Sequence, residues 1–207
     1  MSVRVKICGI TNLADAQAAV EAGADALGFN FYEKSPRQIP TAAAAEISRG
    51  LPAYTLRTGV FVNPSAELVR RAIGECGLKL LQFHGDEAPD FCLQFGLMSM
   101  KAFRIRDAGA LQELSKYRTD VWLLDAYAPD AFGGTGEKFN WDLAIEAQRP
   151  GKPVFLAGGL TPENVAKAVQ QVQPFGVDVS SGVESSPGRK DHARVRAFIK
   201  AAKTTVL

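Results

Sequence analysis

The stretch VRVKICGITNLADAQAAVEAGADALGFNF, residues 3–31, predicts a strand, a helix and a second strand in succession. Its two ends, Val3–Cys8 and Ala26–Phe31, are short apolar runs of the composition that favours strands. The segment between them has apolar residues at helical spacing. Two strands joined by a helix are typical of a parallel sheet, so this unit sets the expected fold class.

The helix inside this unit also carries the signals that begin and end helices. Asn12 is placed to cap the free amides at its start. Leu13, Ala16 and Val20 fall on one face, which we expect to pack on the sheet. Gly23 is placed to end the helix in the left-handed conformation. The helix is therefore predicted to start directly after the first strand.

The same alternation repeats about eight times along the 207 residues, without a break in composition that would mark a domain boundary. For a seventh helix, Thr161 is a candidate N-cap with Pro162 at the first helical position. An open doubly wound sheet and a closed barrel both fit the alternation, and we favour the barrel. Residues 1–207 are thus expected to form a single (βα)8 barrel, with strands at Val3–Cys8, Ala26–Phe31, Arg57–Val62, Leu78–Phe83, Met98–Phe103, Val121–Asp125, Val154–Ala157 and Gly176–Ser180.

The composition narrows the class of partner. Hydrophobic residues make up 46% and charged residues 22% of the chain, and the net charge is +2. This balance provides no basic surface for nucleic acid. No apolar run is long enough for a membrane span or a signal peptide, so a cytoplasmic protein is expected.

The cysteines suggest neither disulfides nor a metal site. Cys8, Cys76 and Cys92 are odd in number and lack CxxC spacing. We predict three free thiols and no zinc site.

In such a barrel, function gathers on the loops after the carboxyl ends of the strands. After the first strand, alternation places Lys6 and Cys8 toward the interior and Val5 and Ile7 toward the helices. Cys8 is either a small buried apolar residue or, at the barrel mouth, a proton acceptor. Lys6 is expected mainly to form a buried ion pair with Asp178, and secondarily to stabilise a thiolate at Cys8.

Carboxylates follow the sixth strand. Asp125 ends an apolar run and precedes a glycine-rich loop, so it is a candidate proton donor or, alternatively, a cap for backbone amides. Asp130, within that loop, is expected to be solvated.

Two glycine-containing loops follow strands seven and eight. Gly158 and Gly159 in LAGGL, with Ser180, Ser181 and Gly182 in DVSSGVE, could be ordinary turn and capping residues. Together in these positions they favour a phosphate site, because backbone amides and a helix start bind anions.

Other polar residues are weaker candidates. Arg37, after strand two, is placed either to clamp a carboxylate or to stay solvated. His84, after strand four, is expected to bind substrate or to satisfy a neighbouring backbone group. We expect His192 to lie on the surface, and Tyr54 to be exposed at the opposite end of the barrel, where it would anchor a dimer if one forms.

Six segments resemble, in order and spacing, the blocks of the phosphoribosylanthranilate isomerase family: KICGIT, GFNFYEKSPRQI, QFHGDE, LLDAYAPDAFGGTGEKFNW, AGGLTPENV and VDVSSGVESSPGRKD. They extend from the first strand to the last helix. The first and last are specific in combination, whereas many phosphate-binding barrels share the glycine pair. Phe83 stands where the family commonly has an aliphatic residue.

This resemblance implies a cofactor-free Amadori rearrangement of N-(5-phosphoribosyl)anthranilate in tryptophan biosynthesis. By position in the motifs, Asp125 would be the general acid and Cys8 the general base. Arg37 would hold the anthranilate carboxylate, the glycine loops the phosphate, and His84 would line the pocket.

Two other classes stay open. Another phosphosugar-converting barrel, such as an epimerase, usually needs several metal-binding histidines, and this chain has two. A noncatalytic phosphate-binding barrel would keep the glycine loops and have no need of Cys8 and Asp125. Either a monomer or a homodimer is compatible with the sequence.

Overall fold

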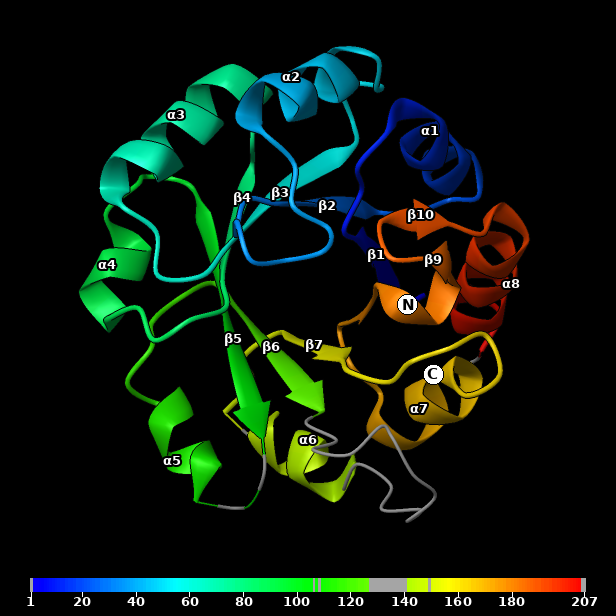
Figure 1. Cartoon of the computed structure of the whole chain (residues 1–207). Helices are drawn as coiled ribbons and strands as arrows, with labels where there is room; N and C mark the ends of the chain where they lie inside the picture. The colour runs from blue at the N-terminus through cyan, green and yellow to red at the C-terminus, as the bar shows by residue number, and fades with distance from the viewer. Residues whose placement is uncertain (1, 106, 108, 127–140, 149, 206–207) are drawn as a thin grey trace.

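The strands close on themselves into one barrel. The computed structural model describes residues 2–205 except 106, 108, 127–140 and 149. Eight parallel strands follow one another around the barrel in chain order, and β8 pairs with β1. The helices form a ring outside the strands (Figure 1). This closed order confirms the predicted (βα)8 fold and excludes the open sheet.

The strands span β1 Arg4–Cys8, β2 Ala26–Asn30, β3 Leu56–Phe61, β4 Leu80–Phe83, β5 Met98–Ile105, β6 Val121–Ala126, β7 Val154–Ala157 and β8 Gly176–Val179. The helices span α1 Leu13–Glu21, α2 Thr41–Arg49, α3 Ala66–Cys76, α4 Pro89–Leu93, α5 Ala110–Leu114, α6 Trp141–Ala147, α7 Val165–Val172 and α8 His192–Lys203. After β8 come a 3-10 helix, η1 Ser181–Val183, and a small hairpin, β9 Glu184–Ser186 with β10 Arg189–Lys190.

All eight predicted strands are present, with their ends displaced by at most two residues. The start of α1 is also confirmed, since the Asn12 side chain accepts a hydrogen bond from the backbone amide of Asp15. The predicted start of the seventh helix was wrong. Residues 162–164 form a turn and α7 begins only at Val165. The Asn164 amide donates to the Thr161 carbonyl three residues back, at 3.2 Å, so this segment is wound as a turn, although the Thr161 hydroxyl accepts the Glu163 amide as an N-cap would.

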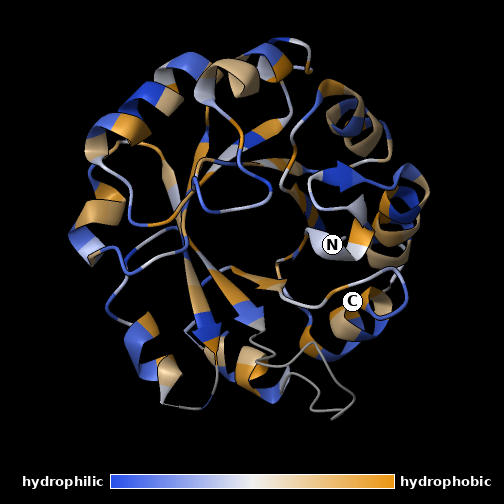
Figure 2. Cartoon of the chain, viewed as in Figure 1, coloured by the Kyte–Doolittle hydropathy of each residue, from blue (hydrophilic) through white to orange (hydrophobic). Residues whose placement is uncertain are grey.

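Apolar side chains fill two separate layers of the barrel. The larger lies between strands and helices and includes Val5 and Ile7, as strand alternation predicted. The smaller lies inside the barrel and consists of Leu80, Met100, Ala102, Leu123, Phe155 and Ala157. These six residues belong to β4, β5, β6 and β7. Figure 2 shows that these strands are mostly hydrophobic. Buried polar side chains also enter the barrel interior, from Lys6 of β1, Thr58 of β3, Gln82 of β4 and Asp178 of β8.

The end of the chain is tied to its beginning by Asp15 on α1. Its carboxylate accepts hydrogen bonds from the backbone amide of Lys190 at 2.8 Å and from Asn12 at 2.7 Å, and lies 2.8 Å from the His192 ring. Burial raises the pKa of Asp15, but these donors outweigh it and the net pKa is lowered. His192, predicted to be a plain surface residue, is only partly exposed because it belongs to this cluster.

Three further expectations concern the cysteines and the surface. All three cysteines are free thiols, as predicted. Tyr54, before β3, has 81% of its surface exposed, which confirms its accessibility and leaves the dimer a prediction. Among the described residues, no helix is long and apolar enough to cross a membrane.

Candidate active site

A cavity of about 460 Å³ opens at the carboxyl ends of the strands. In a barrel, residues leaving different strands converge at this end. Every residue predicted from the sequence to act in the site lines the cavity: Cys8, Arg37, His84, Asp125, Gly158, Gly159, Ser180, Ser181 and Gly182. The fold therefore brings all nine predicted residues to one cavity.

Cys8 lies beside a buried ion pair. Lys6 Nζ is 2.9 Å from Asp178 Oδ1, and the two residues are register partners on β1 and β8. Gly28 makes room for this group, since a Cβ there would lie 2.9 Å from Cys8 Sγ and 3.0 Å from Lys6 Nζ. The predicted pairing of Lys6 with Asp178 is thus confirmed.

The thiol of Cys8 is nearly inaccessible to solvent, with 9% of the residue exposed. Burial raises its pKa, and the nearby ammonium groups of Lys6 and Lys190 offset that shift only in part. In the free protein the pKa is therefore above its usual value, so the lysines limit a rise rather than produce a thiolate at neutral pH.

Asp125 ends β6 with its side chain in the cavity. Its Oδ2 lies 3.3 Å from Nε2 of His84, which follows β4. Both side chains are partly exposed, so solvent or a ligand can reach them. A carboxyl group next to an imidazole is a common arrangement for proton transfer. Cys8 and Asp125 thus line one cavity from different strands.

The loops after β7 and β8 approach one another closely. Gly158 and Gly159 have φ values of 81° and 63°, a region that side-chain-bearing residues rarely adopt. A Cβ on Gly182 would lie 1.9 Å from the Leu160 carbonyl oxygen, so only glycine fits where the loops meet. The short helix η1 begins at Ser181 beside this contact. Each glycine is therefore required by the backbone itself, whatever the loops bind.

Arg37 is not the free guanidinium that the sequence suggested. Its Nε and Nη2 donate to the two carboxylate oxygens of Glu184 at 2.8 and 2.7 Å. Lys190 Nζ donates to the same carboxylate at 2.8 Å. The two cations outweigh burial and hold the pKa of Glu184 below its usual value. One edge of the planar guanidinium is thereby occupied, and Nη1 makes no hydrogen bond to any other described residue.

The loop after β2 is built to hold Arg37 in place. Asn30 Nδ2 donates to the Ser35 hydroxyl at 3.0 Å, and that hydroxyl accepts the backbone amide of Arg37 at 3.1 Å. Gly9 adds clearance, because a Cβ there would lie 2.6 Å from Arg37 Cδ.

Sequence reasoning missed three residues of the site. Glu184 and Lys190 lie in the quoted segment VDVSSGVESSPGRKD, and the need of a buried arginine for a carboxylate partner was the available signal. Gln82 lines the cavity from the interior face of β4. It is two residues before His84, so strand alternation would have placed both on one face. The predicted solvation of Asp130 and the glycine-rich loop around it lie outside the described residues.

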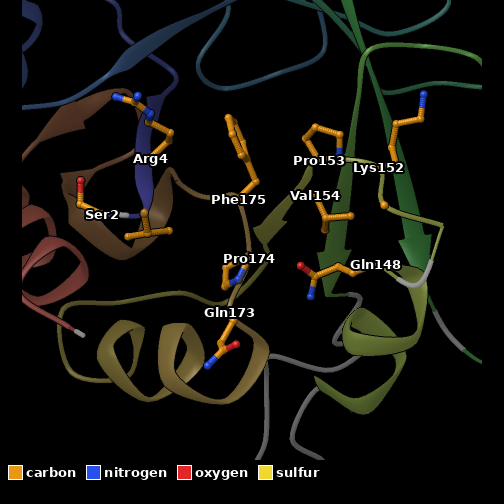
Figure 3. A pocket seen from close by; sticks show the side chains of 11 residues that line it. Ser2, Arg4, Gln148, Lys152, Pro153, Val154, Gln173, Pro174 and Phe175 are labelled. Carbon is orange, nitrogen blue, oxygen red and sulfur yellow. The ribbon is translucent and has the colours of Figure 1, made fainter. Parts of the chain in front are cut away.

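A second hollow, of about 640 Å³, lies at the opposite end of the barrel. Figure 3 shows side chains around it from the segments that precede β1, β7 and β8. Among its described lining residues are Arg4, Lys152 and Phe175, and none is a carboxylate, thiol or imidazole. Size alone would favour this hollow, but of the two it is the cavity at the carboxyl ends whose described lining includes a thiol, a carboxylate and an imidazole.

The fold and the cavity together define a class: a (βα)8-barrel protein with acid-base groups and two glycine loops at its catalytic end. Within the described residues, no cluster of three or more histidine, cysteine, aspartate or glutamate side chains is arranged to hold a metal ion. Comparison with known proteins identifies the family within this class.

The sequence model of the N-(5'-phosphoribosyl)anthranilate (PRA) isomerase family matches residues 5–201. The chain is 54% identical over 201 residues to the isomerase of Trichlorobacter lovleyi, covering 97% of this chain and 98% of that protein. It is 55% identical over 201 residues to that of Geobacter sulfurreducens, with coverage of 97% and 98%.

Solved structures agree. The phosphoribosylanthranilate isomerase of Thermotoga maritima superposes with a TM-score of 0.91 at 44% identity, covering 97% of this chain and 98% of that one. A second structure, of the isomerase in complex with reduced 1-(o-carboxyphenylamino)-1-deoxyribulose 5-phosphate, gives a TM-score of 0.88 at 42% identity, with coverage of 97% and 98%. The chain belongs to the N-(5'-phosphoribosyl)anthranilate isomerase family and is an isomerase of tryptophan biosynthesis.

Proposed function

We propose that this barrel converts N-(5-phosphoribosyl)anthranilate to 1-(2-carboxyphenylamino)-1-deoxyribulose 5-phosphate by general acid-base catalysis. The observation that carries the proposal is the placement of Cys8 and Asp125 on one cavity, with both glycine loops at its rim. The family match supports the reaction, and the cavity supports the division of roles.

Asp125 acts first, as the acid. It gives its proton to the ring oxygen of the sugar, the bond between C1 and that oxygen breaks, and the anthranilate nitrogen forms a protonated Schiff base with C1. Cys8, as thiolate, then takes the proton from C2, and the electron pair neutralises the nitrogen to give an enolamine. Loss of the C2 hydroxyl proton and protonation of C1 produce the ketone. Each positioned acid or base contributes about 10²- to 10⁴-fold in rate.

The two ends of the substrate are anionic and are held by different parts of the rim. Gly158, Gly159, Ser180, Ser181 and Gly182 bind the phosphate through backbone amides and hydroxyls, since loops of this kind after β7 and β8 suit anions. At the other end, the free edge of Arg37 binds the anthranilate carboxylate. His84 lies against Asp125 and lines the space between them. No metal or organic cofactor takes part in any of these steps.

Arg37→Ala is expected to raise KM with little change in kcat, because the carboxylate contact exists in both ground state and transition state. Steady-state kinetics measure both constants. Arg4→Ala is the matched control, since it removes an exposed arginine paired with Asp25 at the other end of the barrel. A loss confined to kcat would contradict the proposal that Arg37 binds the substrate carboxylate.

Catalysis itself is tested by the loss of substrate fluorescence, with the substrate formed in place from anthranilate and phosphoribosyl pyrophosphate. We expect rapid turnover that a chelator leaves unchanged. Absence of turnover with tight binding of a phosphorylated ligand would favour a noncatalytic barrel instead. Loss of activity on chelation would favour a metal-dependent phosphosugar enzyme.

We also propose the cytoplasm as the site of action, as suits a biosynthetic enzyme. The oligomeric state of the protein is either a monomer or a homodimer. Among its structural relatives, the Thermotoga maritima isomerase is described both as a dimer and in monomeric variants.

A further inference from the structure

Gln82 is an unexpected residue for the inside of a barrel. It lies on β4 between Val60 of β3 and Met100 of β5 in the strand register, with 1% of its surface exposed. Its Oε1 is buried and has no hydrogen-bond partner among the described residues. An unsatisfied buried amide is costly, so a purely structural role would be better filled by an apolar side chain.

Within the described part of the chain, the Gln82 carboxamide makes one hydrogen bond, to His84. Gln82 Nε2 lies 3.2 Å from His84 Nδ1, and on the other side of the ring Nε2 lies 3.3 Å from Asp125 Oδ2. The three side chains therefore form a chain from the barrel interior to the proposed acid.

This contact determines where the imidazole carries its proton. A carboxamide nitrogen only donates, so Nδ1 must accept, and the neutral ring then bears its hydrogen on Nε2. The Nε2–H group then faces Asp125 Oδ2 at 3.3 Å, as an electrostatic contact. If the carboxamide were rotated by 180°, Oε1 would face Nδ1 and would need a hydrogen there. The unprotonated Nε2 would then face the Asp125 oxygen.

From this geometry we propose that Gln82 is a positioning residue that fixes His84 as the tautomer with its hydrogen on Nε2. The positive end of the Nε2–H dipole, 3.3 Å from Oδ2, stabilises the negative charge that develops on Asp125 as the other oxygen, Oδ1, releases its proton to the substrate. A bare Nε2 would instead compete with the substrate for that proton. The catalytic part of this inference rests on the proposed role of Asp125, whereas the tautomer assignment does not.

The tautomer is read directly by nitrogen NMR of protein labelled with ¹⁵N-histidine. The chain has only two histidines, and His192→Asn assigns the remaining signal to His84. We expect a hydrogen on Nε2 and none on Nδ1 in the wild type. Gln82→Met should yield a mixture of tautomers, and Gln82→Glu, whose carboxylate only accepts, should move the hydrogen to Nδ1.

Thr58→Val is the matched control. Thr58 is likewise buried on the neighbouring strand with an unpartnered hydroxyl, and no hydrogen bond joins it to His84. This variant should leave the His84 signals unchanged. A wild-type hydrogen on Nδ1, or an unaltered tautomer in Gln82→Met, would overturn the assignment.

Kinetics test the consequence for catalysis. Removing one donor aimed at a developing charge costs about 10²- to 10³-fold, and for the more remote Gln82 we expect kcat to fall about tenfold in Gln82→Met, with KM unchanged. Gln82→Glu should lose more. An active wild type with unchanged kcat in both variants would overturn the positioning role. An inactive wild type would remove the proposed function while the NMR result still decides the tautomer.

Discussion

Cys8→Ser should lower kcat by about 10²- to 10⁴-fold, the contribution of a well-placed general base, while the fold and ligand affinity persist. A serine hydroxyl is far harder to deprotonate than a thiol, so it cannot take the C2 proton. The smaller oxygen fits the space beside Gly28 that holds the sulfur. Fluorescence decay under single-turnover conditions measures the step itself, and titration with the reduced product analogue measures binding.

Cys76→Ser is the matched control for this substitution. Cys76, at the end of α3, is also buried, and its thiol donates to the Thr41 carbonyl, a bond that serine would keep. Its turnover should equal that of the wild type. If Cys8→Ser retained more than about a tenth of the wild-type rate, well short of the loss typical of a missing base, Cys8 would not be the base.

The pH dependence adds a second readout to the same pair of proteins. The reactive form is the thiolate, whose fraction increases as pH rises toward the pKa. Because burial holds the Cys8 pKa above its usual value of about 8.5, kcat/KM of the wild type should still increase with pH above that point. Cys8→Ser should lose this rising limb, and Cys76→Ser should keep it.

The parts of the fold that were predictable from sequence are those governed by local pattern. Apolar alternation located every strand, and it also placed Lys6 opposite Asp178, because neighbouring strands in a closed barrel share a register. The start of α7 was not predictable in this way. Thr161 and Pro162 do mark the turn that leads into the helix, since the Thr161 hydroxyl accepts the Glu163 amide, but local pattern does not show that the turn continues to Asn164 before α7 begins.

The same distinction between local pattern and folded structure applies to the candidate site. Its location followed from the rule that residues leaving parallel strands converge, so all nine predicted residues line one cavity. The partner of Arg37 did not follow, because Arg37 lies in a loop and Glu184 on β9, where no register between barrel strands fixes which residues meet. The rise in the Cys8 pKa was equally out of reach, because it depends on how much water the folded barrel excludes.

Lys6→Met should reduce the free energy of unfolding by about 3–5 kcal/mol, the usual cost of leaving one member of a buried ion pair uncompensated. Lys6 is fully buried, and Asp178 is 8% exposed, so water cannot replace the lost ammonium. The pKa of Lys6 is raised, because the interactions with Asp178 and Cys8 outweigh the effect of burial. Lys6 is therefore a charged ammonium in the folded protein. Urea unfolding, monitored by tryptophan fluorescence, measures the loss.

The double variant Lys6→Met with Asp178→Leu separates an unpaired charge from lost packing. Replacing a buried pair by apolar residues of similar volume is often neutral, so the double variant should recover most of the stability. Lys116→Met, which breaks an exposed pair with Glu113, is the control and should cost about 0–1 kcal/mol. A double variant as unstable as Lys6→Met alone would show that packing dominates. The ion pair would then be a means of filling the barrel beneath Cys8 rather than a source of its electrostatic field.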